Sequence, residues 1–288
     1  AFGQAASYAG APASYLRKLP DELAAINLQY GLEHLTQNEG SLILGHSNGD
    51  DRMRALTSPK YGRIWDAEVV KAVINMNQDE RWQIPAASYS GANPKRATTL
   101  YASDRDVFMF LVDPTHPIEI PKPDGGHDTL FRGFITWNSE TGSAVFGLTT
   151  FLYRYVCDNR IVWGAQDIKE LRIRHTGGAP ERFLYEGAKY LRQYADSSDQ
   201  GEVAQISKAM AYELPTEKPK LTDWLTARGF TRPQAEKAIE TAIGEEGEAR
   251  SLWDIINGVT AYARTIPHTD DRVKVEAQAG KLMQLVAA

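Results

Sequence analysis

The residues best suited to chemistry are basic side chains that fall at the ends of predicted strands, beside aromatic residues. Charges in such places can follow the phosphates of a single nucleic-acid strand, while aromatic rings stack on its bases. We therefore predict a nucleic-acid interface made by eight basic residues: Lys95, Arg96, Arg105, Arg132, Arg160, Lys169, Arg172 and Arg174. The alternative is an ordinary surface of mixed charge.

A second group of residues is acidic and suits metal chemistry. It consists of Asp104, Asp106, Glu140 and Asp158, which fall at predicted strand ends and turns. Carboxylates gathered in this way can hold a magnesium ion, as they do in nucleases. Turns also favour Asp for backbone reasons, which is the simpler interpretation. A metal-dependent nuclease or hydrolase is therefore kept as an alternative hypothesis.

Other catalytic and cofactor motifs are missing from the sequence. The six histidines form no HExxH or His-x-His pattern, and no glycine cluster is followed by the lysine and hydroxyl of a Walker loop. The single cysteine, Cys157, lies in an apolar run and is expected to be a small buried residue. We therefore predict neither a metal site nor a cofactor.

The composition limits the classes of protein to consider. The net charge of −5 argues against a protein that coats nucleic acid with its whole surface, although a local basic groove is compatible with it. No window approaches the roughly 20 apolar residues of a membrane span. We therefore expect a soluble protein that does not bind a membrane. A single thiol without a disulfide partner suits the reducing cytoplasm, which is the compartment we expect. Because the chain begins at Ala1, we also expect an N-terminal piece to be missing.

These residues are expected to be positioned by a central hairpin. Residues 131–137 are rich in aromatic and β-branched side chains, and residues 138–142 (NSETG) have the composition of a turn. Residues 143–156 are apolar at both odd and even positions, which predicts a strand covered on both faces; a buried helix is the competing interpretation. A turn at 157–159 and a short return strand at 160–163 complete this region.

The remaining elements follow from turn and capping signals. We predict hairpins from residues 41–57 and 96–112, an edge strand at 169–175, and a long surface loop at 113–128. Asp66 is expected to cap a helix that ends near residue 77. Further helices are predicted at 12–19, 20–37, 180–195, 199–212, 222–228, 231–243 and 251–264. Thr231 with Gln234 and Ser251 with Asp254 have the spacing of capping boxes.

The elements together predict an α+β fold. We expect an antiparallel sheet centred on residues 131–163, helices packed on one of its faces, and a small C-terminal helical subdomain. A polar linker that contains proline, residues 215–220, predicts a boundary between a core domain of residues 1–215 and a subdomain of residues 216–288.

Several segments resemble a known family. They are GAPASYLRKLP (10–20), WNSETGSAVFGLTTFLYRYVCDN (137–159), RIRHTGG (172–178) and SLWDIINGVTAYART (251–265). Together they resemble the phage/plasmid-like family of unknown function carried on prophages and plasmids, over nearly the whole chain. Asp158 departs from the family pattern, because it separates Cys157 from the asparagine that usually follows. The family has no established reaction, so the resemblance implies the biology of mobile elements without a mechanism.

Our leading hypothesis joins these observations. It is a DNA-binding protein of a mobile element that binds single-stranded DNA as a homo-oligomer, and acts as an annealing or recombination accessory factor without catalytic activity. A protein-interaction module of a mobile element is the third hypothesis.

Overall fold

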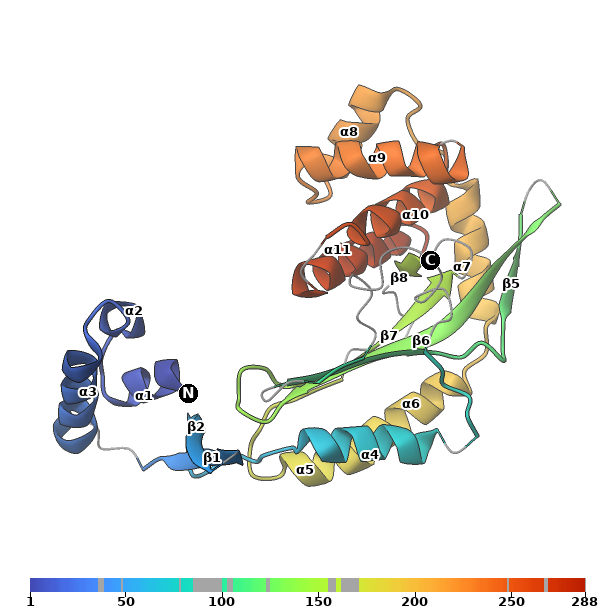
Figure 1. Ribbon diagram of the computed structural model, residues 1–288. Coiled ribbons are helices and arrows are strands. Elements are labelled where there is room, and N and C mark those ends of the chain that lie inside the picture. The colour runs from blue at the N-terminus through green and yellow to red at the C-terminus, as the bar shows by residue number, and fades with distance from the viewer. Residues whose placement is uncertain are drawn as a thin grey trace.

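The computed structural model shows an antiparallel sheet with helices around it, so the predicted α+β class is confirmed (Figure 1). The structure describes residues 1–35, 39–47, 49–77, 79–84, 100–102, 106–122, 125–154, 159–161, 171–247, 249–266 and 269–287. Cys157 lies outside these ranges.

The bounds of the described elements are as follows. The strands are β1 (Ser41–Ser47), β2 (Asp50–Thr57), β3 (Leu100–Ala102), β4 (Asp106–Val112), β5 (Ile118–Pro121), β6 (His127–Ser139), β7 (Phe146–Arg154), β8 (Asn159–Ile161) and β9 (Leu171–Ile173). The α-helices are α1 (Phe2–Tyr8), α2 (Ala13–Leu16), α3 (Asp21–Tyr30), α4 (Asp66–Met76), α5 (Ala179–Arg182), α6 (Ala188–Ala195), α7 (Gln200–Ala211), α8 (Lys218–Thr226), α9 (Arg232–Glu246), α10 (Leu252–Ala263) and α11 (Thr269–Leu282). Three short helical turns are η1 (Gly31–Leu35), η3 (Phe183–Gly187) and η4 (Met283–Leu285).

β6 and β7 form the centre of a seven-stranded sheet with the order β3-β4-β6-β7-β8, in which β5 also pairs with β6 and β9 with β7. The central hairpin is confirmed, with Trp137 opposite Gly147 as the last pair before the turn. Gly142 in that turn has a φ of +77°, a conformation that favours glycine. The hairpin predicted at 41–57 is confirmed as β1-β2. Of the hairpin predicted at 96–112, residues 96–99 and 103–105 lie outside the described residues, and the described strands β3 and β4 pair as expected.

α4, α5 and α6 lie beneath the sheet in Figure 1. α4 directs Val69 and Val73, which are one turn apart, into a cluster with Phe134 of β6 and Leu148 of β7. These strand residues are even-numbered, and alternate side chains of a strand share one face. The even-numbered face of the hairpin is thus the face that these helices cover.

The C-terminal helices pack toward the other end of the long strands (Figure 1). Their apolar cluster contains Leu130 of β6 and Leu152 of β7, again even-numbered, together with Ile206 of α7. α10 is buried on nearly all sides, as expected for a helix at the centre of such a cluster. The cluster contains residues from both sides of position 216. The domain boundary that we predicted at that position stays a prediction.

Both predicted capping boxes are confirmed. The side chain of Thr231 accepts a hydrogen bond from the backbone of Gln234, and that of Ser251 accepts one from the backbone of Asp254. In each case the second residue accepts one in return from the backbone of the cap. α11 was not predicted, because the charged residues at its start conceal the apolar positions Val275, Ala279 and Leu282.

The segment 113–128 is not the continuous loop that its prolines led us to predict. Ile118–Pro121 forms β5, which pairs with residues 127–130 of β6. Ile118 and Ile120 are buried, and Pro121 stands at the end of the strand, where a missing N–H is tolerated. A second correction concerns α4, since Trp65 is its N-cap and Asp66 its first residue.

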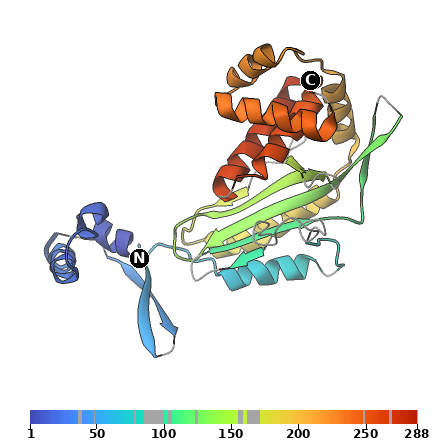
Figure 2. The same ribbon diagram turned by 45° about the horizontal axis from the view of Figure 1, so that its top comes forward.

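Residues 1–57 form an arm at one end of the molecule, as Figures 1 and 2 show. The arm contains α1, α2, α3, η1 and the β1-β2 hairpin. Residues 2–8 form a helix, α1, that was not predicted. Gln4 connects the arm to the central hairpin, because its Nε2 donates to the Thr141 carbonyl at 2.8 Å.

A buried ion pair connects the sheet to the C-terminal helices. Arg154 Nε donates to Asp128 Oδ1 at 2.6 Å, and Trp253 Nε1 of α10 donates to Asp128 Oδ2 at 3.1 Å. Asp128 and Arg154 are 2% and 3% exposed. Because a buried charge is costly without a partner, this contact fixes how α10 sits on the strands.

Asp128→Asn tests this contact. The substitution leaves the buried guanidinium of Arg154 without its carboxylate, which should lower the free energy of unfolding by about 3 to 5 kcal/mol. Urea denaturation measures the change. Glu240→Gln is the control, because Glu240 pairs with Lys218 at an exposed site and the substitution should leave the free energy of unfolding nearly unchanged. Equal unfolding midpoints for D128N and the wild type would contradict the assignment.

Candidate nucleic-acid interface

The face of the sheet opposite to α4 carries most of its aromatic side chains. The strand register places Phe108 opposite Trp137, Phe131 opposite Tyr153, and Phe151 opposite Gly133. We call the following residues the aromatic face: Phe108, Phe110, Phe131, Trp137, Phe151 and Tyr153. Phe110, Phe151 and Tyr153 are buried, whereas Phe108, Phe131 and Trp137 are partly exposed. The three partly exposed rings are the ones that a base could stack on.

Two glycines make room for this packing. A Cβ at Gly133 would lie 2.2 Å from the ring of Phe151, and a Cβ at Gly147 would lie 2.0 Å from the ring of Trp137. No side chain could therefore stand at either position unless the ring moved. Because glycine has no side chain, the ring of Phe151 can lie flat on β6 at Gly133, and the ring of Trp137 can lie flat on β7 at Gly147.

Arg172 of β9 and Arg174, just after it, lie at the border of the aromatic face. Ile173 is fully buried against α4 and its neighbours, so the residues on either side of it point the other way. Arg172 and Arg174 are both exposed. Arg172 pairs in register with Gly147, the glycine that lies under the ring of Trp137. The structure thus brings Arg172 close to an aromatic ring, with the exposed Arg174 two residues further along the chain.

Arg132 does not have the position that the prediction requires. It is even-numbered, so it faces the helices and is only 5% exposed. Its Nη2 lies 3.5 Å from Glu202 Oε1 of α7, and its guanidinium lies over the ring of Tyr194. We therefore no longer count Arg132 among the phosphate-binding candidates.

The other predicted basic residues are not placed. Lys95, Arg96, Arg105 and Lys169 lie outside the described residues. For Arg160 only the backbone is described, and it pairs with Tyr153 of the aromatic face. These assignments stay predictions.

The acidic residues of the alternative hypothesis include Glu140, which is held by arginines. Its Oε2 accepts hydrogen bonds from Arg63 and from Arg54, the latter at 3.3 Å, and its Oε1 accepts one from the backbone N–H of Asp66 at 2.9 Å. Burial acts to raise the pKa of Glu140, but the hydrogen bond and charge of Arg63 outweigh it and hold that pKa below its usual value. Glu140 thus connects the arm, the start of α4 and the central turn.

Asp66 and Asp106 lie near this cluster. Burial raises the pKa of Asp66 to about 6; the hydrogen bond from Asn138 opposes this rise, and the charge of Glu140 adds to it. Asp106 accepts a hydrogen bond from Ser143 Oγ at 3.0 Å. Asp104 and Asp158 lie outside the described residues, and within the described part of the chain no group of three or more His, Cys, Asp or Glu could hold a metal ion.

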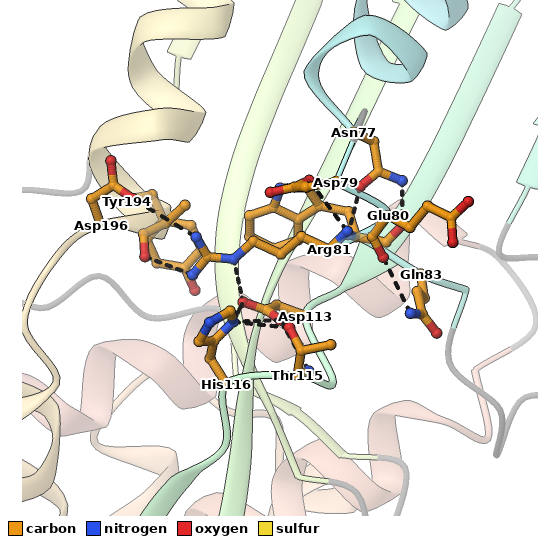
Figure 3. Close-up of polar contacts among 12 residues, drawn as sticks. Asn77, Asp79, Glu80, Arg81, Gln83, Asp113, Thr115, His116, Tyr194 and Asp196 are labelled. Atoms are coloured by element: carbon orange, nitrogen blue, oxygen red, sulfur yellow. Dashed lines mark hydrogen bonds and ion pairs between the residues drawn. The ribbon is translucent and has the colours of Figure 1, made fainter.

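Arg81 is the centre of a separate polar cluster (Figure 3). Its Nε donates to Asp113 at 2.5 Å, and its Nη2 donates to the carbonyl of Ala195 at 2.8 Å. His116 Nδ1 lies 2.9 Å from Asp113. A histidine beside a carboxylate is typical of general bases, but here the carboxylate is already neutralised by Arg81. The cluster joins the end of β4 to the end of α6, which is a structural role.

The sequence of the chain matches a known protein family. Residues 57–285 match the domain of unknown function DUF932. The chain belongs to the DUF932 family. Searches of the curated proteins and of the solved structures find no match. The family assignment fits the expected family of unknown function and names no reaction.

The DUF932 domain contains the whole aromatic face, β9 and the Glu140 side chain, whereas nearly all of the arm precedes it. Within the described part of this chain, no helix is long and apolar enough to cross a membrane. Phe108, Phe131 and Trp137 were not among the predicted site residues. Phe131 and Trp137 share one face of β6, which alternation along the strand could have indicated, but only the register between β4 and β6 places Phe108 beside Trp137.

Glu140→Gln separates a structural role from a metal-binding one. It removes a charged hydrogen-bond acceptor shared by two arginines, so we expect the free energy of unfolding to fall by about 1.5 to 3 kcal/mol. Thermal and urea denaturation, without added metal, give the change. Glu236→Gln, in an exposed ion pair with Arg232, is the control. A stability of E140Q equal to the wild type, together with DNA cleavage by the wild type in magnesium that E140Q lacks, would instead favour the nuclease.

Proposed function

We propose that this DUF932 protein binds single-stranded DNA in a mobile element, and that it acts as an annealing or recombination accessory factor without catalytic activity. The observation that carries the proposal is the exposed pair Arg172 and Arg174 at the border of the aromatic face. Phosphates and bases need different partners, and this edge of the sheet offers both kinds.

The geometry suits a flexible single strand better than a duplex. Arg172 and Arg174 are two residues apart, which spans about 7 Å along a strand. The partly exposed rings of Trp137 and Phe131 belong to one face of β6, so bases that splay away from the phosphates can reach them. Bases inside a duplex have no free ring face to offer.

The biological setting rests on the resemblance to proteins of prophages and plasmids. Such elements replicate and recombine through single-stranded intermediates. A protein that binds single strands without cutting them suits this role. The nuclease alternative is weaker, because both carboxylate oxygens of Glu140 are already bound by protein groups. Without Glu140, a metal site would have to be made by Asp104, Asp106 and Asp158 alone.

Removing the two arginines tests the proposal. Fluorescence anisotropy with a labelled single-stranded oligonucleotide should show binding by the wild type that weakens steeply with salt. R172A/R174A should reduce the slope of log K against log salt by about 1.4, because two phosphate contacts are lost. K218A/K237A removes two exposed charges from the C-terminal helices and is the matched control. No binding by the wild type at low salt, or equal slopes for both double variants, would overturn the proposal.

Trp137→Leu tests the aromatic contribution separately. Leucine keeps an apolar side chain on the sheet but offers no ring to a base, so affinity should fall by roughly five- to a hundredfold. The salt slope should stay as in the wild type, because no phosphate contact changes. Circular dichroism checks that the variant is folded. Unchanged affinity in folded W137L would exclude this ring from the interface.

A further inference from the structure

The arm exposes several large apolar residues, although Leu16 of α2 is buried. On α3, Leu23, Ile26 and Tyr30 are 49%, 61% and 57% exposed. The positions i, i+3 and i+7 form one stripe of a helix. Ala24 of α3 is buried, and Gly31 at the start of η1 packs on Ala9, the residue after α1, since a Cβ at Gly31 would lie 2.3 Å from the Ala9 carbonyl oxygen. An apolar stripe of this size on a surface indicates a docking site.

The charged residues of α3 and η1 themselves are acidic. Asp21 and Glu22 lie in the first turn of α3 and Glu33 lies in η1, and all three are exposed. A partner for α3 should therefore combine an apolar hollow with a basic rim.

The structure contains such a hollow on η3 and α6. It has a volume of about 500 Å³, and its lining includes Leu184 and Tyr185, which are 60% and 71% exposed. Its charged lining residues are Lys189, Arg192 and Asp196, and Asp196 also lies 3.7 Å from Arg81. Lys189 Nζ lies 6.0 Å from the centre of the Tyr185 ring, and neither Lys189 nor Arg192 makes an ion pair with any described residue, so the lining is basic on balance. Its apolar and basic residues are complementary to the apolar and acidic residues of α3.

The two surfaces belong to separate parts of the molecule. Figures 1 and 2 show the arm projecting from one end, while α6 lies beneath the sheet. The DUF932 match begins at residue 57, so α3 lies outside the domain that carries the hollow. The α3 of one molecule can thus reach the α6 of another.

We propose that the apolar stripe of α3 binds the hollow on η3 and α6 of a second copy of this chain. The contact joins two different surfaces, so each molecule uses one of each and the assembly grows head to tail into a ring or a filament. This inference does not rest on DNA binding and is tested without DNA.

Two double variants test the contact in the full-length chain. I26S/Y30S removes the stripe, and L184S/Y185S removes the apolar part of the hollow. All four side chains are exposed, so folding should be unaffected. Sedimentation velocity over a range of concentrations should show assemblies for the wild type, and association weakened at least about tenfold for each variant. Ile243→Ser, an exposed apolar residue of α9, is the control that should assemble as the wild type does.

Mixing the two variants gives the decisive result. Each retains the surface that the other lacks, so the mixture should form a dimer and nothing larger. A wild type that stays monomeric at every concentration would overturn the proposal. So would loss of assembly in I26S/Y30S alone, because that result indicates contacts between two arms.

Discussion

The alternation of side chains along β6 is the constraint on which the rest of the structure depends. Even-numbered residues such as Leu130 and Phe134 face the two groups of helices, and odd-numbered residues such as Phe131 and Trp137 form the aromatic face. Antiparallel pairing with β4 and β7 continues this division across the sheet. A register shift of one residue would place the aromatic rings against the helices, so packing and the candidate interface are specified together.

The helical face of β6 also carries charge, which must be compensated. Arg132 is paired with Glu202 of α7, and Asp128 with Arg154 and Trp253. Such buried pairs add little net stability, because desolvation offsets most of their attraction. Their effect is to penalise wrong arrangements, since a displaced helix would leave a buried charge unpaired. The pairs therefore position α7 and α10 on the strands more than they strengthen the fold.

The sequence allowed much of the local structure to be predicted, but not the faces of the sheet. Turn residues and capping boxes identified the hairpins and the helices α9 and α10, because their signals are local. Arg132 and Arg172 were both predicted to contact phosphates, since both are arginines of predicted strands. The structure separates them, because burial depends on which face the neighbouring strands and helices cover. β5 was missed because Pro114 and Pro117 precede it and concealed the short alternation of Ile118 and Ile120.

The proposed DNA binding requires the charges of this acidic protein to act locally. Charges farther apart than the Debye length, about 8 Å at physiological salt, are largely screened from each other. Several acids, among them Asp113, Asp128 and Glu140, are neutralised by arginines, so the net charge of −5 says little about any one edge of the sheet. Two arginines alone release few counterions, however, and give weak binding. A head-to-tail assembly would repeat the same edge along one strand of DNA, and linked weak contacts bind far more tightly than each does alone. Self-association through the arm would in this way make a two-arginine edge sufficient.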